Sequence, residues 1–197
     1  CRSDLNFEVN DMLSQLHVFG IKTAYPHEYA MSGTATNRAK PYIVYFSSAS
    51  SSKKCWPVGH FSRLIERMSS SYPNHDHLVL EGIQSWEKEK VQAILAPLND
   101  QRNIAPIQAD TLEQTTNLLM GADLLVSNDT GIRHVAIVSG TPTAGIFFVD
   151  PYRYWPRYNI HEIALSEAGG PPEVDQVYAM CERTMSTKRS GIYSADL

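Results

Sequence analysis

From residue 41 onward, short apolar runs alternate with longer amphipathic stretches. The run YIVYFS at 42–47 precedes a stretch at 57–72 whose apolar residues recur three and four positions apart. An uninterrupted apolar run is typical of a strand buried on both faces, whereas this spacing is typical of a helix with one buried face. The pattern predicts a strand and then a helix, with Pro57 at the first helical position. The helical spacing rests on Phe61, Leu64, Ile65 and Met68.

The same alternation continues to about residue 185. Further strands are predicted at 77–81, 103–109, 123–127, 142–148 and 160–165, and further helices at 85–98, 111–122, 130–140 and 172–185. Such alternation predicts an α/β fold over residues 41–185, a doubly wound parallel sheet with right-handed crossovers. Because these sheets bind ligands outside the carboxyl ends of their strands, the loops that follow the strands are the candidates for a site.

Local signals mark some of these elements. Ser85 is the expected N-cap of the helix at 85–98. Asp110 or Thr111 caps the helix at 111–122, and Gly121 closes it. Pro106 interrupts the run at 103–109 and makes that strand the weakest of the set.

The two ends of the chain stand apart from this pattern. An apolar stripe predicts a helix at 8–19, and the Gly, Pro, Ser and Thr content of 21–40 is typical of a connector. We therefore expect residues 1–40 to be a helix plus an interdomain connector, so that the chain is part of a larger two-domain protein. Residues 186–197 lack periodicity and are expected to form a flexible tail.

Charge and cysteine content narrow the class of protein. The 17 basic and 21 acidic residues give a net charge of −4 with no long run of one sign, which argues against nucleic acid as a partner. Three widely spaced cysteines suit neither a disulfide framework nor a zinc site, so no metal is expected. We find no apolar stretch of membrane-spanning length and no signal pattern. The expected location is the cytoplasm.

The predicted strand at 123–127 leads into a helix through five small, mostly polar residues. These are Ser127, Asn128, Asp129, Thr130 and Gly131. A helix N-terminus presents unpaired N–H groups and a positive dipole, and small side chains let a phosphate approach them. An ordinary capped helix, with Asp129 or Thr130 as N-cap, accounts for the same residues. His134, one turn later, either faces a ligand or is a buried core histidine.

The loop after the first strand carries a second signal. It is rich in hydroxyl groups and holds Lys53 and Lys54 just before the helix at 57–72. Lysines beside a helix N-terminus form an anion site, although two solvated surface lysines fit the loop equally well. The loop matches neither the Walker A nor the GxGxxG pattern. A single DTG tripeptide is too little for an aspartic protease, and Ser127 does not lie in GxSxG.

Taken in order, these motifs resemble the C-terminal domain of glycosyltransferase family 9, the lipopolysaccharide heptosyltransferases. The family pattern is Lys-x-Trp-Pro at a helix start, a strand ending in Gly before an acidic helix, and Ser-Asn-Asp-Thr-Gly-x-x-His-x-Ala followed by Gly-x-Pro. The matching residues here are Lys54, Trp56, Pro57, Gly82, Ser127, Asn128, Asp129, Thr130, Gly131, His134, Ala136, Gly140 and Pro142. The match spans most of the chain.

The resemblance implies a GT-B architecture, in which two Rossmann-like domains close over a nucleotide-sugar donor. This chain corresponds to the donor-binding half. The general base, an aspartate in the family, and the site for a lipid-linked acceptor belong to the N-terminal domain, so no catalytic residue is assigned here and the half alone is expected to be inactive. The donor is expected to be of the ADP-heptose type, used as a substrate, with no further cofactor.

The resemblance also implies roles for individual residues. Lys54 would neutralise donor phosphate, and the N–H groups of Thr130 and Gly131 would hold the diphosphate. Asp129 would orient sugar hydroxyls or the turn itself, and His134 would lie near the sugar or the phosphate. The full expected donor-binding set is Ser47, Lys54, Glu87, Ser127, Asn128, Asp129, Thr130, Gly131 and His134.

Three points stay open at this stage. Either Gln84 or Glu87 stands where the family has a ribose-binding glutamate, and Trp56 either stacks on the base or packs under its helix. The segments SSAS at 47–50 and YRYWPRY at 152–158 depart from the family pattern and leave the donor's identity open.

The implied reaction is inverting sugar transfer in lipopolysaccharide or cell-surface glycan synthesis, in the cytoplasm or peripherally at the inner face of the inner membrane. Lys54 and the helix dipole would stabilise the leaving diphosphate. A non-catalytic nucleotide-binding module and a different GT-B enzyme, such as a nucleotide-sugar epimerase, are the alternatives.

Overall fold

The computed structural model describes residues 19–20, 31–148, 151, 161–165 and 170–189. The helix expected at 8–19, except for its last residue, and the aromatic segment 152–158 lie outside the described residues. The strands are β1 (Tyr42–Phe46), β2 (Asp76–Leu80), β3 (Ile104–Ile107), β4 (Leu124–Asn128), β5 (Thr143–Phe147) and β6 (His161–Leu165). The helices are η3 (Ser52–Lys54), α2 (Val58–Ser71), α3 (Ser85–Leu95), η4 (Ala96–Leu98), α4 (Leu112–Met120), α5 (Gly131–Val138) and α6 (Val174–Arg189).

The six strands form one sheet in the order β3-β2-β1-β4-β5-β6, and every neighbouring pair is parallel. This confirms the predicted doubly wound fold. The chain first adds strands on one side of β1 and then returns to add β4 on its other side. The order therefore reverses between β1 and β4, which is where such sheets open a crevice for a ligand.

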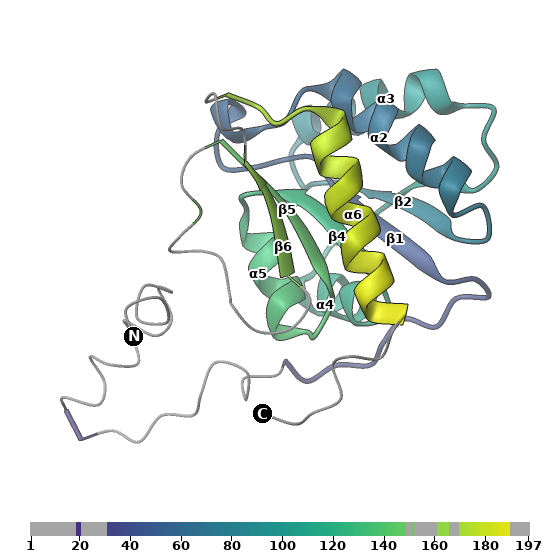
Figure 1. Ribbon diagram of the computed structural model, residues 1–197. Helices are drawn as coiled ribbons and strands as arrows, with labels where there is room; N and C mark the ends of the chain where they lie inside the picture. Colours follow the sequence, from purple (N-terminus) through teal and green to yellow (C-terminus); the bar gives the residue numbers. More distant parts are fainter. Residues whose placement is uncertain (1–18, 21–30, 149–150, 152–160, 166–169, 190–197) are drawn as a thin grey trace.

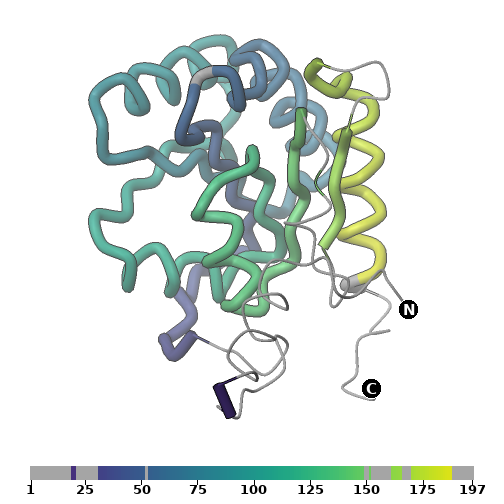
Figure 2. The backbone as a smooth tube through the Cα atoms, turned by 90° about the vertical axis from the view of Figure 1, so that its left-hand side faces the viewer, coloured from purple at the N-terminus to yellow at the C-terminus, as the bar shows by residue number. Residues whose placement is uncertain are grey.

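Helices cover both faces of the sheet (Figure 1). Along β1, Ile43 and Tyr45 face the core shared with α2, α3 and α6, whereas Val44 and Phe46 face the core shared with α4 and α5. Figure 2 shows α6 running alongside β5 and β6. This alternation of buried side chains explains why β1 reads as a continuous apolar run: both of its faces are covered.

Several helix ends differ from the prediction by one or a few residues. Pro57 is the N-cap of α2 and precedes its first turn. Ser85 is the first residue of α3, and Gln84 is the N-cap. Thr111 caps α4 by accepting a hydrogen bond from Gln114 N at 3.1 Å. The last helix, α6, continues to Arg189, four residues beyond the end that its periodicity predicts.

The described part of the connector, residues 31–40, lies against the C-terminal ends of α4 and α5. Met31 N donates to Val138 O at 3.0 Å, and Thr36 N donates to Asn117 O at 2.8 Å. Thr34 N donates to Asn117 Oδ1 at 2.9 Å. Helices between parallel strands run opposite to those strands, so this segment reaches β1 from the edge opposite the ligand-binding crevice.

Candidate functional site

The reversal of strand order brings together the two loops that the sequence marks as an anion site. In the register of β1 and β4, Phe46 lies opposite Ser127. The loop at 47–57 and the turn at 127–131 therefore leave the sheet side by side, at its carboxyl edge.

The side chain of Asn128 joins the two loops. Its Nδ2 donates to Ser47 O at 2.6 Å, and its Oδ1 accepts from Trp56 N at 2.9 Å. Asn128 is 0% exposed, so both bonds are shielded from water. The two contacts require opposite ends of the amide and so fix its orientation. Asn128 therefore holds the loop at 47–57 against the end of β4. A direct contact of Asn128 with the donor stays a prediction.

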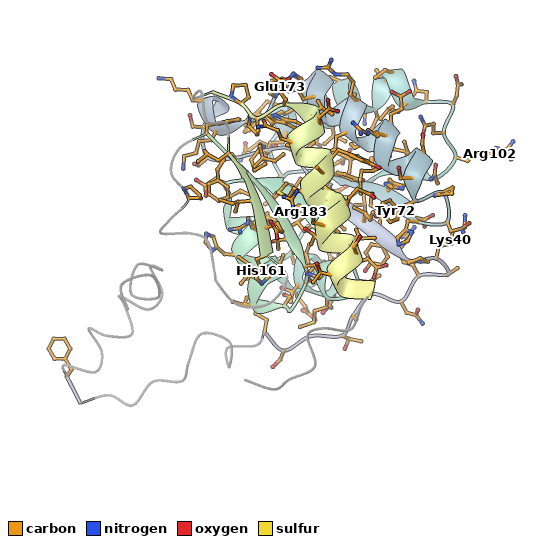
Figure 3. The ribbon with its side chains drawn as sticks, in the orientation of Figure 1. Lys40, Tyr72, Arg102, His161, Glu173 and Arg183 are labelled. Carbon is orange, nitrogen blue, oxygen red and sulfur yellow. The ribbon has the colours of Figure 1, made fainter. Side chains whose placement is uncertain are left out.

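Trp56 packs beneath α2. Its ring is fully buried, stands edge-on to Phe61, and donates from Nε1 to Pro172 O at 2.8 Å. Pro172 precedes Glu173, which Figure 3 labels at the start of α6. The indole therefore ties the loop at 47–57 to α6. Of the two roles left open for Trp56, the structure shows the packing role.

Lys54 and Asp129 form an ion pair between the two loops, with 2.8 Å between Nζ and Oδ2. The Lys54 side chain is 44% exposed and the Asp129 side chain 15% exposed, so the pair is open to solvent on the lysine side. Asp129 thus orients Lys54, a contact that the sequence reasoning did not anticipate. A phosphate beside Lys54 would therefore meet an ammonium whose charge this carboxylate partly offsets.

The N-terminus of α5 directly follows the turn that carries Asp129. Thr130 is its N-cap, with extended backbone angles, and the Thr130 side chain makes no capping hydrogen bond. Gly131 follows and is exposed, and a Cβ added there would meet nothing within 4 Å. The first N–H groups of this helix are therefore available to an anion, in line with the positive end of the helix dipole.

Two buried hydroxyl groups lie where these two loops leave the sheet. Ser47 and Ser127 are almost fully buried, and neither Oγ has a hydrogen-bond partner among the described residues. Ser47 directly follows β1, and Ser127 is the residue before the last in the neighbouring strand β4. His134 is half-buried in the first turn of α5. The site roles assigned to these three residues stay predictions.

Glu87 lies at the start of α3, in a different loop. Its Oε2 accepts from Gln84 N at 3.0 Å, and a Cβ on Gly82 would collide with its carboxylate. The carboxylate therefore closes the first turn of α3, while Gln84 is exposed. Both residues lie beyond the carboxyl end of β2, the neighbour of β1. A ribose contact by either one stays a prediction.

Comparison with known families agrees with this geometry. The model of glycosyltransferase family 9 (heptosyltransferase) matches residues 5–180. The chain belongs to glycosyltransferase family 9. The match confirms the resemblance seen in the ordered motifs. A search of curated proteins gave no match.

Solved family 9 structures share the fold. Escherichia coli ADP-heptose lps heptosyltransferase II is 18% identical, with a TM-score of 0.65 over 78% of this chain and 49% of that one. E. coli heptosyltransferase WaaC with ADP is 20% identical, with a TM-score of 0.62 over 78% and 46%. A family 9 glycosyltransferase from Veillonella parvula is 16% identical, with a TM-score of 0.74 over 92% and 61%. The chain thus spans about half the length of the two E. coli proteins.

A more distant fold likeness extends to a nucleotide-sugar epimerase. UDP-GlcNAc 2-epimerase from Neisseria meningitidis bound to UDP-GlcNAc is 11% identical, with a TM-score of 0.53 over 78% of this chain and 38% of that one. Within the described residues, no helix has the length and apolar character needed to cross a membrane. The same residues contain no group of three His, Cys, Asp or Glu side chains close enough to hold a metal ion.

Two basic residues of this family 9 chain lie near the site and were missed by the sequence reasoning. Arg133 in α5 is almost fully buried, with its guanidinium 5.3 Å from the ring centre of Phe147. Burial lowers the pKa of Arg133 to about 10, and the charge of Asp129 acts in the opposite direction. A Cβ on Gly145 would lie 2.6 Å from Arg133 Nε, so the small residue in β5 makes room for this side chain.

The second missed residue is Lys90 in α3, whose Nζ donates to Ser47 O at 2.7 Å. A sequence signal for both residues exists. Lys90 lies one turn before buried Ile94, and Arg133 lies one turn before buried Ile137. Each basic residue therefore falls on the apolar stripe of its helix. A charged side chain is rarely buried there without a polar partner.

Proposed function

We propose that this chain is the donor-binding half of an inverting glycosyltransferase and that its donor is a nucleoside diphosphate sugar of the ADP-heptose type. The observation that carries the proposal is the open N-terminus of α5 beside Lys54, at the reversal of strand order. Family membership and the fold likeness to WaaC, solved with ADP, support it. A crevice of this kind suits a diphosphate flanked by a nucleoside and a sugar.

In this proposal the diphosphate lies at the mouth of α5. The N–H groups of Thr130 and Gly131 donate to phosphate oxygens, and Lys54 exchanges Asp129 for the phosphate. The freed Asp129 carboxylate then turns to sugar hydroxyls, since it would repel the phosphate. His134, in the first turn of α5, lies beside the sugar or the phosphate.

The proposed reaction needs the other half of the protein. An acceptor hydroxyl, deprotonated by a carboxylate of that half, attacks the anomeric carbon as the diphosphate leaves. Lys54 and the dipole of α5 stabilise the charge that develops on the leaving group, an electrostatic contribution made by groups already in place. We propose no catalytic base in this chain, and we expect the chain alone to transfer no sugar.

The acceptor we propose is a lipid-linked glycan bound by the other half, in lipopolysaccharide or other cell-surface glycan synthesis. Such an acceptor would hold the enzyme at the cytoplasmic face of the inner membrane. The basis for this step is the family alone, so the donor experiment comes first.

Titration calorimetry of the 197-residue chain with ADP-, UDP- and GDP-sugars tests donor binding. We expect one nucleotide class to bind, and Lys54→Ala to weaken binding by roughly tenfold, as for one charge-assisted hydrogen bond. Lys53→Ala is the matched control, because Lys53 is the exposed neighbour of Lys54. Gly131→Val should abolish binding without unfolding the chain, since its Cβ enters open space. Unchanged binding in both Lys54→Ala and Gly131→Val would contradict the site.

Adding the missing half separates the alternatives. Transfer from donor to acceptor supports the proposal. Donor binding without any turnover in the reassembled protein favours a non-catalytic nucleotide-binding module. Turnover of the donor in the absence of an acceptor favours an epimerase.

A further inference from the structure

Lys90 reaches the start of the loop at 47–57 from a third element, α3. It lies in the second turn of α3, is half-buried, and donates from Nζ to Ser47 O at 2.7 Å. The same carbonyl oxygen accepts Asn128 Nδ2 at 2.6 Å. The ammonium of Lys90 is therefore two hydrogen bonds away from the turn that leads into α5.

The charge of Lys90 has no counterpart close by. Lys54 contacts Asp129, whereas Lys90 has no carboxylate within ion-pair distance among the described residues. Glu87, one turn earlier on α3, directs Oε2 to Gln84 N. A half-buried ammonium is thus held by a neutral carbonyl, which compensates its lost hydration poorly.

The fold does not require this contact. Asn128 already supplies a hydrogen-bond donor to Ser47 O, and a buried carbonyl with one donor is common in proteins. Among the described residues, the only hydrogen bond of Lys90 is the one to Ser47 O, so two of its three N–H donors remain available. An anion contact needs a positive charge without a nearby carboxylate and N–H donors without a partner, and Lys90 has both among the described residues.

We propose that Lys90 is a second phosphate-binding residue of the site and that, given the proposed function, it contacts the diphosphate of the donor. The charge of Lys54 is partly offset by the Asp129 carboxylate, whereas Lys90 has only a neutral oxygen as its partner. Lys90 therefore supplies positive charge that no carboxylate within ion-pair distance offsets among the described residues. Recognition of a diphosphate then rests on α3 as well as on the two loops found from the sequence.

Calorimetry on the 197-residue chain tests this with inorganic pyrophosphate, ADP and adenosine at low and high salt. Lys90→Gln keeps a donor for Ser47 O and removes the charge. Lys88→Gln is the matched control, because Lys88 is a half-buried lysine of the same helix whose side chain makes no polar contact among the described residues. Lys90→Arg restores the charge. Thermal unfolding of each variant reports on the fold.

We expect Lys90→Gln to weaken pyrophosphate and ADP binding by roughly tenfold at low salt and to leave adenosine binding unchanged. Lys88→Gln should match the original chain, and Lys90→Arg should recover most of the affinity. Equal pyrophosphate affinity in Lys90→Gln and the original chain would overturn the proposal. An equal loss in Lys88→Gln, or a loss that tracks a lower melting temperature and is not restored in Lys90→Arg, would overturn it as well.

The outcomes for Lys90 and for the proposed function are distinguishable. Pyrophosphate binding that depends on Lys90, with no binding of any nucleotide sugar, keeps the Lys90 assignment and removes the proposed function. Nucleotide-sugar binding that is unchanged in Lys90→Gln keeps the proposed function and removes the Lys90 assignment. A chain that binds neither pyrophosphate nor nucleotide contradicts both.

Discussion

Lys54 and Asp129 are 75 positions apart in the sequence, yet Lys54 Nζ lies 2.8 Å from Asp129 Oδ2. The contact joins the loop after β1 to the turn after β4, across the point where the strand order reverses. The sequence reasoning expected Lys54 to neutralise a donor phosphate. In the structure Lys54 is paired with a carboxylate. The net charge at this edge of the sheet depends on both members of the pair.

Asp129→Asn should strengthen the binding of inorganic pyrophosphate. The substitution frees Lys54 and removes a negative charge from the crevice, so we expect affinity to rise about fivefold at low salt and the gain to shrink at high salt. Because Lys54 is 44% exposed, the loss of the pair should lower the free energy of unfolding by less than about 1 kcal/mol. Titration calorimetry and urea denaturation measure the two effects.

The control for Asp129 is Asp123→Asn, at the other end of β4. Asp123 pairs with His75, with 3.1 Å between Oδ2 and Nε2, at the edge away from the crevice. If Asp123→Asn raised pyrophosphate affinity as much as Asp129→Asn, the gain would come from the net charge of the protein. The claim that Asp129 acts through its contact with Lys54 would then be wrong.

Asn128→Ala should destabilise the fold by about 3 kcal/mol. The change leaves Trp56 N without its buried acceptor and Ser47 O without one of its donors, and an unsatisfied buried group costs about 1–3 kcal/mol. Urea denaturation provides the measurement. Asn99→Ala, at an exposed site after η4, should change stability by no more than about 0.5 kcal/mol. A cost as small for Asn128 would show that the two loops are held by other contacts.

His77 should make the protein less stable in acid. Its ring is buried, with Nε2 facing Tyr72 O at 3.2 Å and Nδ1 facing Tyr45 Oη at 2.9 Å. Nε2 therefore donates to the carbonyl and Nδ1 accepts from the hydroxyl. Burial lowers the pKa of His77 to about 4, while the bond to Tyr72 O and the charge of Asp76 raise it and the charge of His75 lowers it.

The sign of the effect follows from linkage. Above pH 6.5 His77 is neutral in both states and contributes no pH dependence. Between pH 6.5 and about 4 the unfolded chain binds a proton that the folded chain excludes, so the free energy of unfolding falls by about 3 kcal/mol as the pH drops through this range. His77→Gln should remove that part of the acid loss in urea titrations at several pH values. His161 adds its own contribution, because burial also lowers its pKa, to about 3. An unchanged slope in His77→Gln would contradict the assignment.

Gly33→Ala should loosen the connector. A Cβ at Gly33 would lie 2.6 Å from Asn117 Oδ1 and 3.0 Å from Met120 Sδ, so the segment must move away from α4. We expect faster hydrogen exchange at the amides of Thr34 and Thr36, which bond to Asn117, with the strands unchanged. The double variant Gly33→Ala, Asn117→Ala removes one clashing atom and should restore part of the protection at Thr36. Equal exchange in all three chains would show that the connector is held elsewhere.

Much of the fold was predictable because its signals are local. The continuous apolar run of β1 and the helical spacing of α2 act within a few residues and appear directly in the sequence, as does the cap at Thr111. The helix ends shifted by one residue at Pro57 and Gln84, since the energy of a cap is small and neighbouring residues compete for the position.

The site was predictable in part. The turn before α5 carries its own signal, since the small residues end a strand and begin a helix. The roles of Lys54 and Trp56 depend on partners far along the chain, namely Asp129 and the carbonyl of Pro172. Lys90 was missed because its partner, Ser47 O, belongs to the backbone of another loop and leaves no trace in side-chain spacing.

The amino-acid sequence is sufficient to predict alternating strands and helices, a parallel sheet, and a small polar turn between a strand and a helix. These follow from hydrophobic periodicity and backbone chemistry, which act over one or two turns of chain. The strand order, the Lys54–Asp129 pair, the burial of Trp56 and the approach of Lys90 arise from packing. They depend on which strands become neighbours, and the placement of β4 beside β1 brings residues from distant segments to one edge of the sheet.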